Sequence, residues 1–150
     1  MTTDASGTPT VTPTGVRRIT VADVLRPATT SVETRAHLAA AAYLMRRSGD
    51  DALVVTTDDA EHRPIAIVTD ADIAQAVADG RNLEETRISD LDAAPPVTVE
   101  PSTSVVEATR TMLLLRIRHL PVVEAGRLVG IIDMSDACGA LLERDPAASD

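Results

Sequence analysis

The chain repeats itself, because residues 21 to 80 can be aligned with residues 88 to 143. Two pairs of stretches show the match most clearly: Ile67-Val-Thr-Asp-Ala-Asp72 with Ile131-Ile-Asp-Met-Ser-Asp136, and Ala52-Leu-Val-Val55 with Leu120-Pro-Val-Val123. A period this long exceeds one supersecondary unit. The repeat therefore predicts two similar halves that bury their apolar faces against each other.

The core of these halves must be aliphatic. The chain has 150 residues, enough to bury about two-thirds of its unfolded surface, but it contains no Phe or Trp and a single Tyr, Tyr43. Leu, Ile, Val, Met and Ala must therefore fill the interior. Tyr43 lies in an alanine-rich segment, and we expect it to fill the interface between the halves.

The charge and the cysteine content restrict the partners and the compartment. A formal charge of −9, with no Lys, argues against binding to nucleic acid or to an anionic membrane. The apolar stretch at residues 38 to 45 is too short to span a bilayer. A lone cysteine, Cys138, and an N-terminus without the pattern of a signal peptide predict a reducing cytoplasm.

Each repeat has the same expected order of elements: a helical turn, an extended segment, a helix, two strands and a final helix. In the second repeat these are an extended segment at 96 to 100, a helix at 104 to 116, strands at 120 to 124 and 128 to 132, and a helix ending at 143. Ser104 with Glu107 forms the expected capping box of the first helix, and Ser135 is the expected cap of the second.

The first repeat follows the same order with a longer hairpin loop at 57 to 64. Its expected elements are a helix at 35 to 47 capped by Thr34, strands at 52 to 56 and 65 to 68, and a helix at 71 to 78. The predicted organisation is a disordered tail at 1 to 15, one motif at 16 to 82, a second at 83 to 143, and a flexible tail at 144 to 150.

With Arg118-His-Leu-Pro-Val-Val123 before the second hairpin and Thr69-Asp-Ala-Asp72 after the first, residues 19 to 143 resemble a tandem CBS domain, named after cystathionine β-synthase. The resemblance implies a mixed α/β (α+β) fold, in which two β-α-β-β-α repeats pack with pseudo-two-fold symmetry as a stand-alone Bateman module. It also implies assembly into a homodimer.

Members of this family bind AMP, ADP, ATP or S-adenosylmethionine between the two repeats. By that resemblance, a carboxylate at the start of the last helix of a repeat accepts hydrogen bonds from the ribose hydroxyls, and a hydroxyl three residues earlier adds a contact. The candidate ligand contacts that the resemblance implies are Thr69 and Asp72, Asp133 and Asp136, Arg118 and His119 on the phosphate side, and Thr30 and Thr98 on the extended segments.

The two implied half-sites differ. Asp133 replaces the threonine of the pattern, which disfavours an anionic ligand or favours S-adenosylmethionine. Arg118 and His119 align with Asp50 and Asp51, and Pro121 with Leu53. We therefore expect one competent site, with Asp72 holding ribose, and a second site that is degenerate or differently tuned.

Structural roles for the same residues remain open. A carboxylate near a helix start, such as Asp72 or Asp136, stabilises the helix dipole whether or not a ligand binds. Thr69 and Asp133 are equally suited to capping a helix, and Arg118 to a solvated strand entry. The three histidines lack the spacing of metal ligands, so no metal site is predicted.

No nucleophile elbow, metal cluster or glycine-rich phosphate loop is present in the sequence, so we expect no enzyme activity. The favoured function is a regulatory module that binds an adenosyl ligand, requires no cofactor and signals to an unidentified protein. The alternative is a dimeric interaction scaffold that has lost its ligand.

Overall fold

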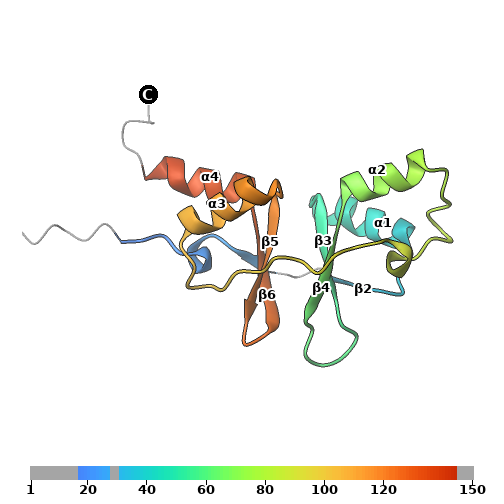
Figure 1. Cartoon of the computed structure of the whole chain (residues 1–150), viewed down its shortest axis with the longest axis horizontal. Coiled ribbons are helices and arrows are strands. Elements are labelled where there is room, and N and C mark those ends of the chain that lie inside the picture. The colour runs from blue at the N-terminus through green and yellow to red at the C-terminus, as the bar shows by residue number, and fades with distance from the viewer. Residues whose placement is uncertain (1–16, 28–30, 145–150) are drawn as a thin grey trace, which may run out of the picture.

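Two similar halves lie side by side, each a small sheet with helices on one side of it (Figure 1). The computed structural model describes residues 17 to 27 and 31 to 144. The first repeat contains η1 (Val21–Asp23), β1 (Arg26–Pro27), β2 (Ser31–Glu33), α1 (Leu38–Ser48), β3 (Ala52–Thr56), β4 (Pro64–Thr69) and α2 (Asp70–Ala78). The second contains η2 (Ile88–Asp90), α3 (Val105–Leu115), β5 (His119–Glu124), β6 (Arg127–Asp133) and α4 (Met134–Glu143). This order confirms the predicted mixed α/β fold.

Each half has a three-stranded sheet. The sheet of the second half contains β1 from the first repeat beside two strands from the second repeat. The order is β2-β3-β4 in the first half and β1-β6-β5 in the second. β2 runs parallel to β3, whereas β1 runs antiparallel to β6. In the predicted extended segment 96 to 100, Val99 forms one parallel bridge with Val122 but the segment is not a strand.

The halves exchange their opening turns. Val21 of η1 is buried in the core of the second half, and Ile88 of η2 is buried in the core of the first. The backbone follows the same exchange, since the Val21 amide donates to the carbonyl of Thr103 at 2.8 Å and the Ile88 amide to that of Ala36 at 2.9 Å. Each packed half is therefore built from both sequence repeats.

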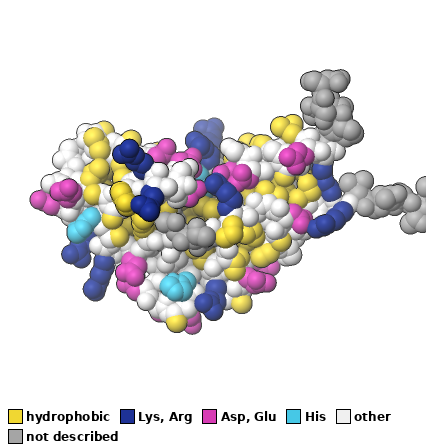
Figure 2. Space-filling view, turned by 180° about the vertical axis from the view of Figure 1, so that it is seen from behind, with side chains coloured by type: hydrophobic (Ala, Val, Ile, Leu, Met, Phe, Trp, Pro, Cys, Tyr) yellow, Lys and Arg dark blue, Asp and Glu magenta, His cyan; other side chains and the backbone are white. Residues whose placement is uncertain are grey.

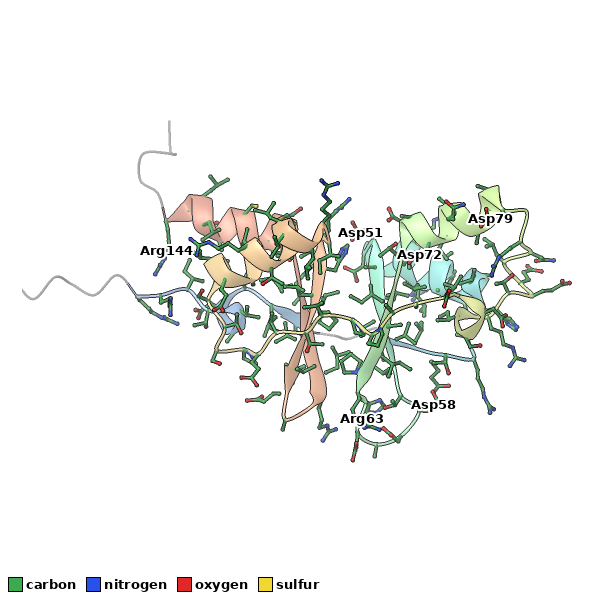
Figure 3. The ribbon with its side chains drawn as sticks, in the orientation of Figure 1. Asp51, Asp58, Arg63, Asp72, Asp79 and Arg144 are labelled. Atoms are coloured by element: carbon green, nitrogen blue, oxygen red, sulfur yellow. The ribbon has the colours of Figure 1, made fainter. Side chains whose placement is uncertain are left out.

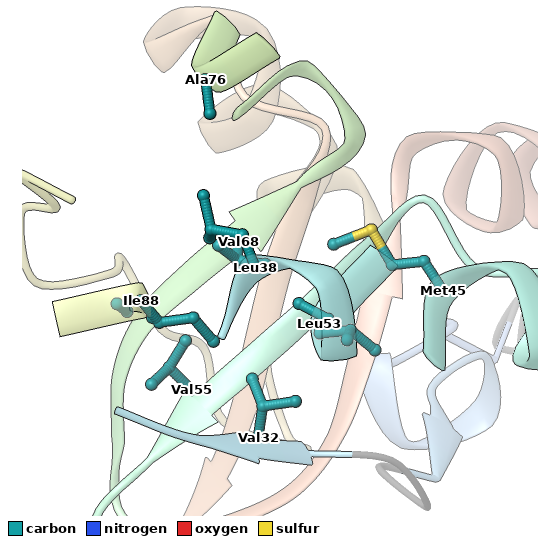
Figure 4. Close-up of a cluster of buried hydrophobic side chains, with 10 residues drawn as sticks. Val32, Leu38, Met45, Leu53, Val55, Val68, Ala76 and Ile88 are labelled. Carbon is teal, nitrogen blue, oxygen red and sulfur yellow. The ribbon is translucent and has the colours of Figure 1, made fainter. Parts of the chain in front are cut away.

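The cores are aliphatic, as predicted. In the first half, Leu53, Val55 and Val68 from the sheet pack against Leu38 and other residues of α1 (Figure 4). The corresponding residues of the second half are Met112, Leu120, Val122 and Ile132. All of these side chains are almost completely withdrawn from solvent.

The position predicted for Tyr43 is wrong, because its side chain is 60% exposed. Leu38, Ala41 and Met45 are buried and occupy the core face of α1 at helical spacing. Tyr43 lies off that stripe, and its hydroxyl accepts a hydrogen bond from Arg47 at 3.2 Å. The buried face of α1 carries Leu38, Ala41 and Met45, so Tyr43 lies on the face that is exposed to solvent.

Two of the predicted helix caps are wrong. α1 begins at Leu38 rather than after Thr34, and the Leu38 amide donates to the carbonyl of Thr86, so a backbone group replaces a side-chain cap. α4 is capped by Asp133, not Ser135. Ser104 caps α3 with its hydroxyl accepting from the Glu107 amide at 3.1 Å, which is one of the two hydrogen bonds of the predicted capping box.

The two predicted tails fall outside the described residues, except for Arg144, which follows α4. In the part of the chain that is described, none of the helices has both the length and the apolar character needed to cross a membrane.

The strand pairing corrects the alignment of the repeats by one residue. The Asp70 amide donates to the carbonyl of Asp51, and the equivalent Met134 amide donates to that of Arg118, each at 2.9 Å. Asp51 is therefore equivalent to Arg118, Ala52 to His119 and Val54 to Pro121. The apolar runs at 52 to 55 and 120 to 123 misled the sequence alignment, because a strand buried on both faces lacks the alternation that would fix its register.

Candidate functional site

A cavity of about 750 Å³ opens beside the start of α2, and both repeats contribute to its walls. Three segments line it: residues 67 to 81 from β4, α2 and the turn after α2, residues 91 to 97 after η2, and residues 115 to 119 between α3 and β5. We call this cavity the open cleft. Its size falls in the range of small-molecule sites.

Thr69 and Asp72 stand together at the rim of the open cleft. The backbone amide and the hydroxyl of Thr69 lie 2.8 Å and 3.1 Å from Oδ2 of Asp72, and the Thr69 hydroxyl accepts from the Asp72 amide at 3.3 Å. This is a capping box, and it fixes the carboxylate at the first turn of α2. Among the described residues, none donates a hydrogen bond to Oδ1 of Asp72, so capping leaves one acceptor oxygen beside the cavity.

Arg118 and His119 line the opposite side of the open cleft, but both are engaged by Asp51. Oδ2 of Asp51 accepts from Nη2 of Arg118 at 2.8 Å, and Oδ1 lies 2.8 Å from Nε2 of His119. Partial burial favours the neutral carboxyl of Asp51, but the hydrogen bond and charge of His119, together with Arg118, outweigh it and lower its pKa. Figure 3 shows Asp51 and Asp72 in the first half, Asp51 beside the start of β3 and Asp72 at the start of α2.

The open cleft contains two further cations that the sequence analysis missed, Arg81 after α2 and Arg116 after α3. Arg116 lines it from the C-terminal end of α3, where its backbone adopts a left-handed conformation with φ 55°. Gly49 occupies the equivalent position after α1, with φ 76°. A bulky residue where helices commonly end in glycine is a signal that could have identified Arg116 as unusual.

Asp133 and Asp136, the implied contacts of the second half-site, do not line a comparable cavity. Oδ1 of Asp133 accepts from the Asp136 amide at 2.7 Å, which makes Asp133 the cap of α4. Its other oxygen is bonded to Arg26, whose Nε also lies 2.9 Å from Oδ2 of Asp136. The sequence did not point to Arg26, because β1 reaches this site only through its pairing with β6.

The remaining candidates lie on the extended segments. Thr98 is exposed and does not line the open cleft, although its neighbours Pro96 and Val97 do. Thr30 lies outside the described residues. Across residues 17 to 27 and 31 to 144, no three His, Cys, Asp or Glu side chains are grouped so as to hold a metal ion.

Charge on the surface is mixed. Figure 2 shows Arg side chains separated from one another by acidic and apolar groups on the face turned away from the viewer in Figure 1. The face seen in Figure 2 therefore carries no continuous basic stripe of the kind that binds nucleic acid.

Comparison with known proteins agrees with the fold. The model of the CBS domain matches residues 21 to 79 and 88 to 143. An uncharacterized protein of Methanopyrus kandleri is 34% identical over 130 residues, which cover 81% of this chain and 62% of the relative. CBS domain-containing proteins of Arabidopsis thaliana are 41% identical over 86 residues, only 15% of their length. The chain thus spans less than two-thirds of these relatives.

Solved structures match over most of the chain. A protein with CBS domains from Burkholderia ambifaria has a TM-score of 0.73 and 32% identity, covering 84% of this chain and 96% of that one. The CBS domain protein of Pyrobaculum aerophilum in complex with AMP has a TM-score of 0.74 and 30% identity, covering 87% and 95%. A hexameric CBS-CP12 protein from bloom-forming cyanobacteria has a TM-score of 0.75 and 27% identity, covering 91% and 77%. On its two matched domains and its fold, the chain belongs to the CBS-domain family.

Proposed function

We propose that this CBS pair is a regulatory module that binds an adenosine-containing ligand in the open cleft and signals to a partner protein. The observation that carries the proposal is the position of Asp72, whose carboxylate is fixed by the capping box and retains an acceptor oxygen beside a cavity of about 750 Å³. A carboxylate so placed is suited to the two hydroxyls of a ribose.

The walls of the open cleft fit the other parts of such a ligand. Aliphatic side chains, among them Ile67, Val97 and Ile117, offer two apolar surfaces for a purine without any aromatic residue. Arg116 and Arg118 offer donors for a phosphate on the side nearer α3. The AMP complex of the Pyrobaculum aerophilum protein supports an adenosyl ligand for this fold.

The output of the module is a change in arrangement rather than a reaction. A ligand that contacts residues of both repeats favours one relative position of the halves, and a partner protein that distinguishes those positions reads the change. We propose no catalytic role for the described residues. The lone cysteine is consistent with action in the reducing cytoplasm.

We also propose that the module self-associates, as a homodimer at least. Leu113 and Leu114 on α3 are 64% and 83% exposed, and Leu142 on α4 is 61% exposed. Adjacent helices that expose large aliphatic side chains are suited to a partner surface. The hexameric assembly of the cyanobacterial CBS-CP12 protein supports association between modules of this family.

The test is a thermal unfolding series on nucleotide-stripped protein with AMP, ADP, ATP, S-adenosylmethionine and GTP. A ligand at about 100 times its dissociation constant adds about 2.7 kcal/mol to the free energy of unfolding. We expect a rise in the midpoint with adenosyl compounds and not with GTP, and no rise when Asp72 is replaced by Ala.

Asp23→Ala is the matched control for Asp72→Ala. Asp23 accepts hydrogen bonds from the Thr20 amide and hydroxyl at 3.0 Å and 3.2 Å, so it forms the same kind of capping box away from the open cleft. Both variants lose a cap, but only Asp72→Ala should lose the ligand response. A ligand response that survives Asp72→Ala would show that the site is elsewhere.

The second candidate is a scaffold without a ligand. The observation that favours it is that Asp51 already binds both Arg118 and His119. In that case none of the compounds should raise the unfolding midpoint, while self-association and partner binding persist.

A further inference from the structure

The second cleft, which pseudo-symmetry places opposite the open one, contains an arginine among three carboxylates. Nη1 of Arg26 lies 2.9 Å from Oδ1 of Asp50, Nη2 is bonded to Asp133, and Nε lies 2.9 Å from Oδ2 of Asp136. Asp50 belongs to the first half and the other two to the second. One guanidinium therefore holds both halves together at the point where a ligand would enter.

The open cleft has no such group, because its equivalent residue is Ala93. Val21 and Ile88 open their repeats at matching positions, so the same spacing pairs Arg26 with Ala93. Ala93 lines the open cleft without filling it. The hollow that remains on the other side, about 600 Å³, is lined by Arg26 but not by Asp133 or Asp136. Arg26 therefore borders this hollow in place of the two carboxylates, whose side chains are 15% and 35% exposed.

A glycine permits this arrangement. Arg26 and Pro27 pair with Ile131 and Gly130 of β6, and a Cβ on Gly130 would stand 2.6 Å from the Arg26 carbonyl oxygen and 2.6 Å from Leu25. The residue equivalent to Gly130 in the first half is Ala66, which pairs with Val55 as Gly130 pairs with Val122. The segment that contains Ala93 forms no strand with β4.

We propose that Arg26 is a built-in occupant of the second cleft, which Gly130 admits, and that it reserves Asp133 and Asp136 for itself so that the protein has one cleft available to a ligand. The difference between the two clefts then arises because Arg26 fills the second cleft, and not only because Asp133 replaces a threonine. Arg26 is the residue that determines how many ligands one chain takes.

Charge explains why the occupant stays in place. Three carboxylates face one guanidinium, so its departure would leave like charges close together. Partial burial lowers the pKa of Arg26, but Asp133, Asp136 and Asp50 outweigh that effect and raise it. An anionic ligand would meet this acidic group, whereas a small cation would fit it.

The test is chemical rescue of Arg26→Ala with millimolar ethylguanidinium, read as the midpoint of thermal unfolding at neutral pH. We expect the variant to melt several degrees below the wild type and ethylguanidinium to restore part of the loss. The wild type and Arg17→Ala should gain nothing, since Arg17 makes a single exposed pair with Asp23. Adding Asp133→Asn to Arg26→Ala should abolish the rescue, because it removes one of the carboxylates that bind the probe.

A second variant reaches the same site without deleting the charge. Gly130→Ala should displace β1 from β6 and expose the carboxylates, which hydrogen exchange of the amides at 130 to 133 would report as faster exchange. The proposal would be overturned if Arg26→Ala had the unfolding midpoint of the wild type, or if ethylguanidinium did not raise the midpoint of Arg26→Ala. These readouts need no adenosyl ligand, so their failure is distinct from failure of the proposed function.

Discussion

Asp51 and Arg118 occupy equivalent positions in the two repeats and are bound to each other, with Oδ2 and Nη2 2.8 Å apart. A pseudo-two-fold axis brings equivalent residues together where it passes between the halves. Opposite charges at that point attract, whereas two residues of the same charge there would repel each other. The divergence of the repeats at this position therefore links the halves and also neutralises the basic side of the open cleft.

Removing the charge of Asp51 should favour more anionic ligands. In Asp51→Asn, Arg118 and His119 are released from a carboxylate and become available to phosphate. The pair is exposed, and such pairs are worth about 0.2 to 1 kcal/mol, which corresponds to a gain of up to about 5-fold in affinity. We expect the gain to be larger for ATP than for AMP in calorimetric titrations.

Asp58→Asn is the control for this change, because Asp58 lies on the hairpin loop away from the open cleft (Figure 3). It alters the net charge equally and should leave the ATP to AMP ratio unchanged. Equal gains in both variants would mean that overall charge, not Asp51, sets the preference.

The contribution of Asp51 to stability should depend on pH in the acid range. Its pKa in the folded protein lies below the ordinary value of 3.8, so the unfolded chain binds more protons there and stability falls with falling pH. The contribution is complete above about pH 5 and is lost progressively as the pH falls through 3.8 and then through the lower pKa of the folded state. The difference in unfolding midpoint between the wild type and Asp51→Asn should therefore shrink on acidification. A difference that stays constant down to about pH 3 would contradict the pairing.

Because the halves exchange their opening turns, a core substitution in the opening turn of one sequence repeat should destabilise the packed half that contains the other repeat's strands. Ile88→Ala should cost about 2 to 5 kcal/mol of unfolding free energy, because it empties a site that is 3% exposed. The amides of β3 and β4 should lose hydrogen-exchange protection first, although Ile88 belongs to the second repeat. Ile65→Ala, at a site 36% exposed, should have a much smaller effect.

Self-association should depend on the apolar surface of α3. Leu114 is 83% exposed, and replacing it with Asp places a charge where a partner helix would pack. We expect Leu114→Asp to lower the molar mass measured by light scattering at concentrations where the wild type associates. Ala60→Asp on the hairpin loop is the control, and an unchanged mass for Leu114→Asp would exclude this face.

The amino-acid pattern alone predicted the fold of the repeat and paired Thr69 with Asp72 at the candidate site. Runs of aliphatic and polar residues, repeated once, identified the helices α1 to α4 and the strands β3 to β6, because periodicity records which face of an element is buried. The strands β1 and β2 were not assigned, since two or three residues are too few to show a period. The spacing between Thr69 and Asp72 was also visible in the sequence, since a capping box depends on residues in one turn of chain.

The surroundings of Thr69 and Asp72 became visible only once the two repeats were packed together. Asp51 meets Arg118 and His119, and Arg26 meets Asp133 and Asp136, across separations in sequence that no local pattern records. The exchange of η1 and η2 between the halves was hidden for the same reason. The physical cause is that long-range ion pairs and strand pairing depend on how the two repeats pack, which the local pattern of each repeat does not record.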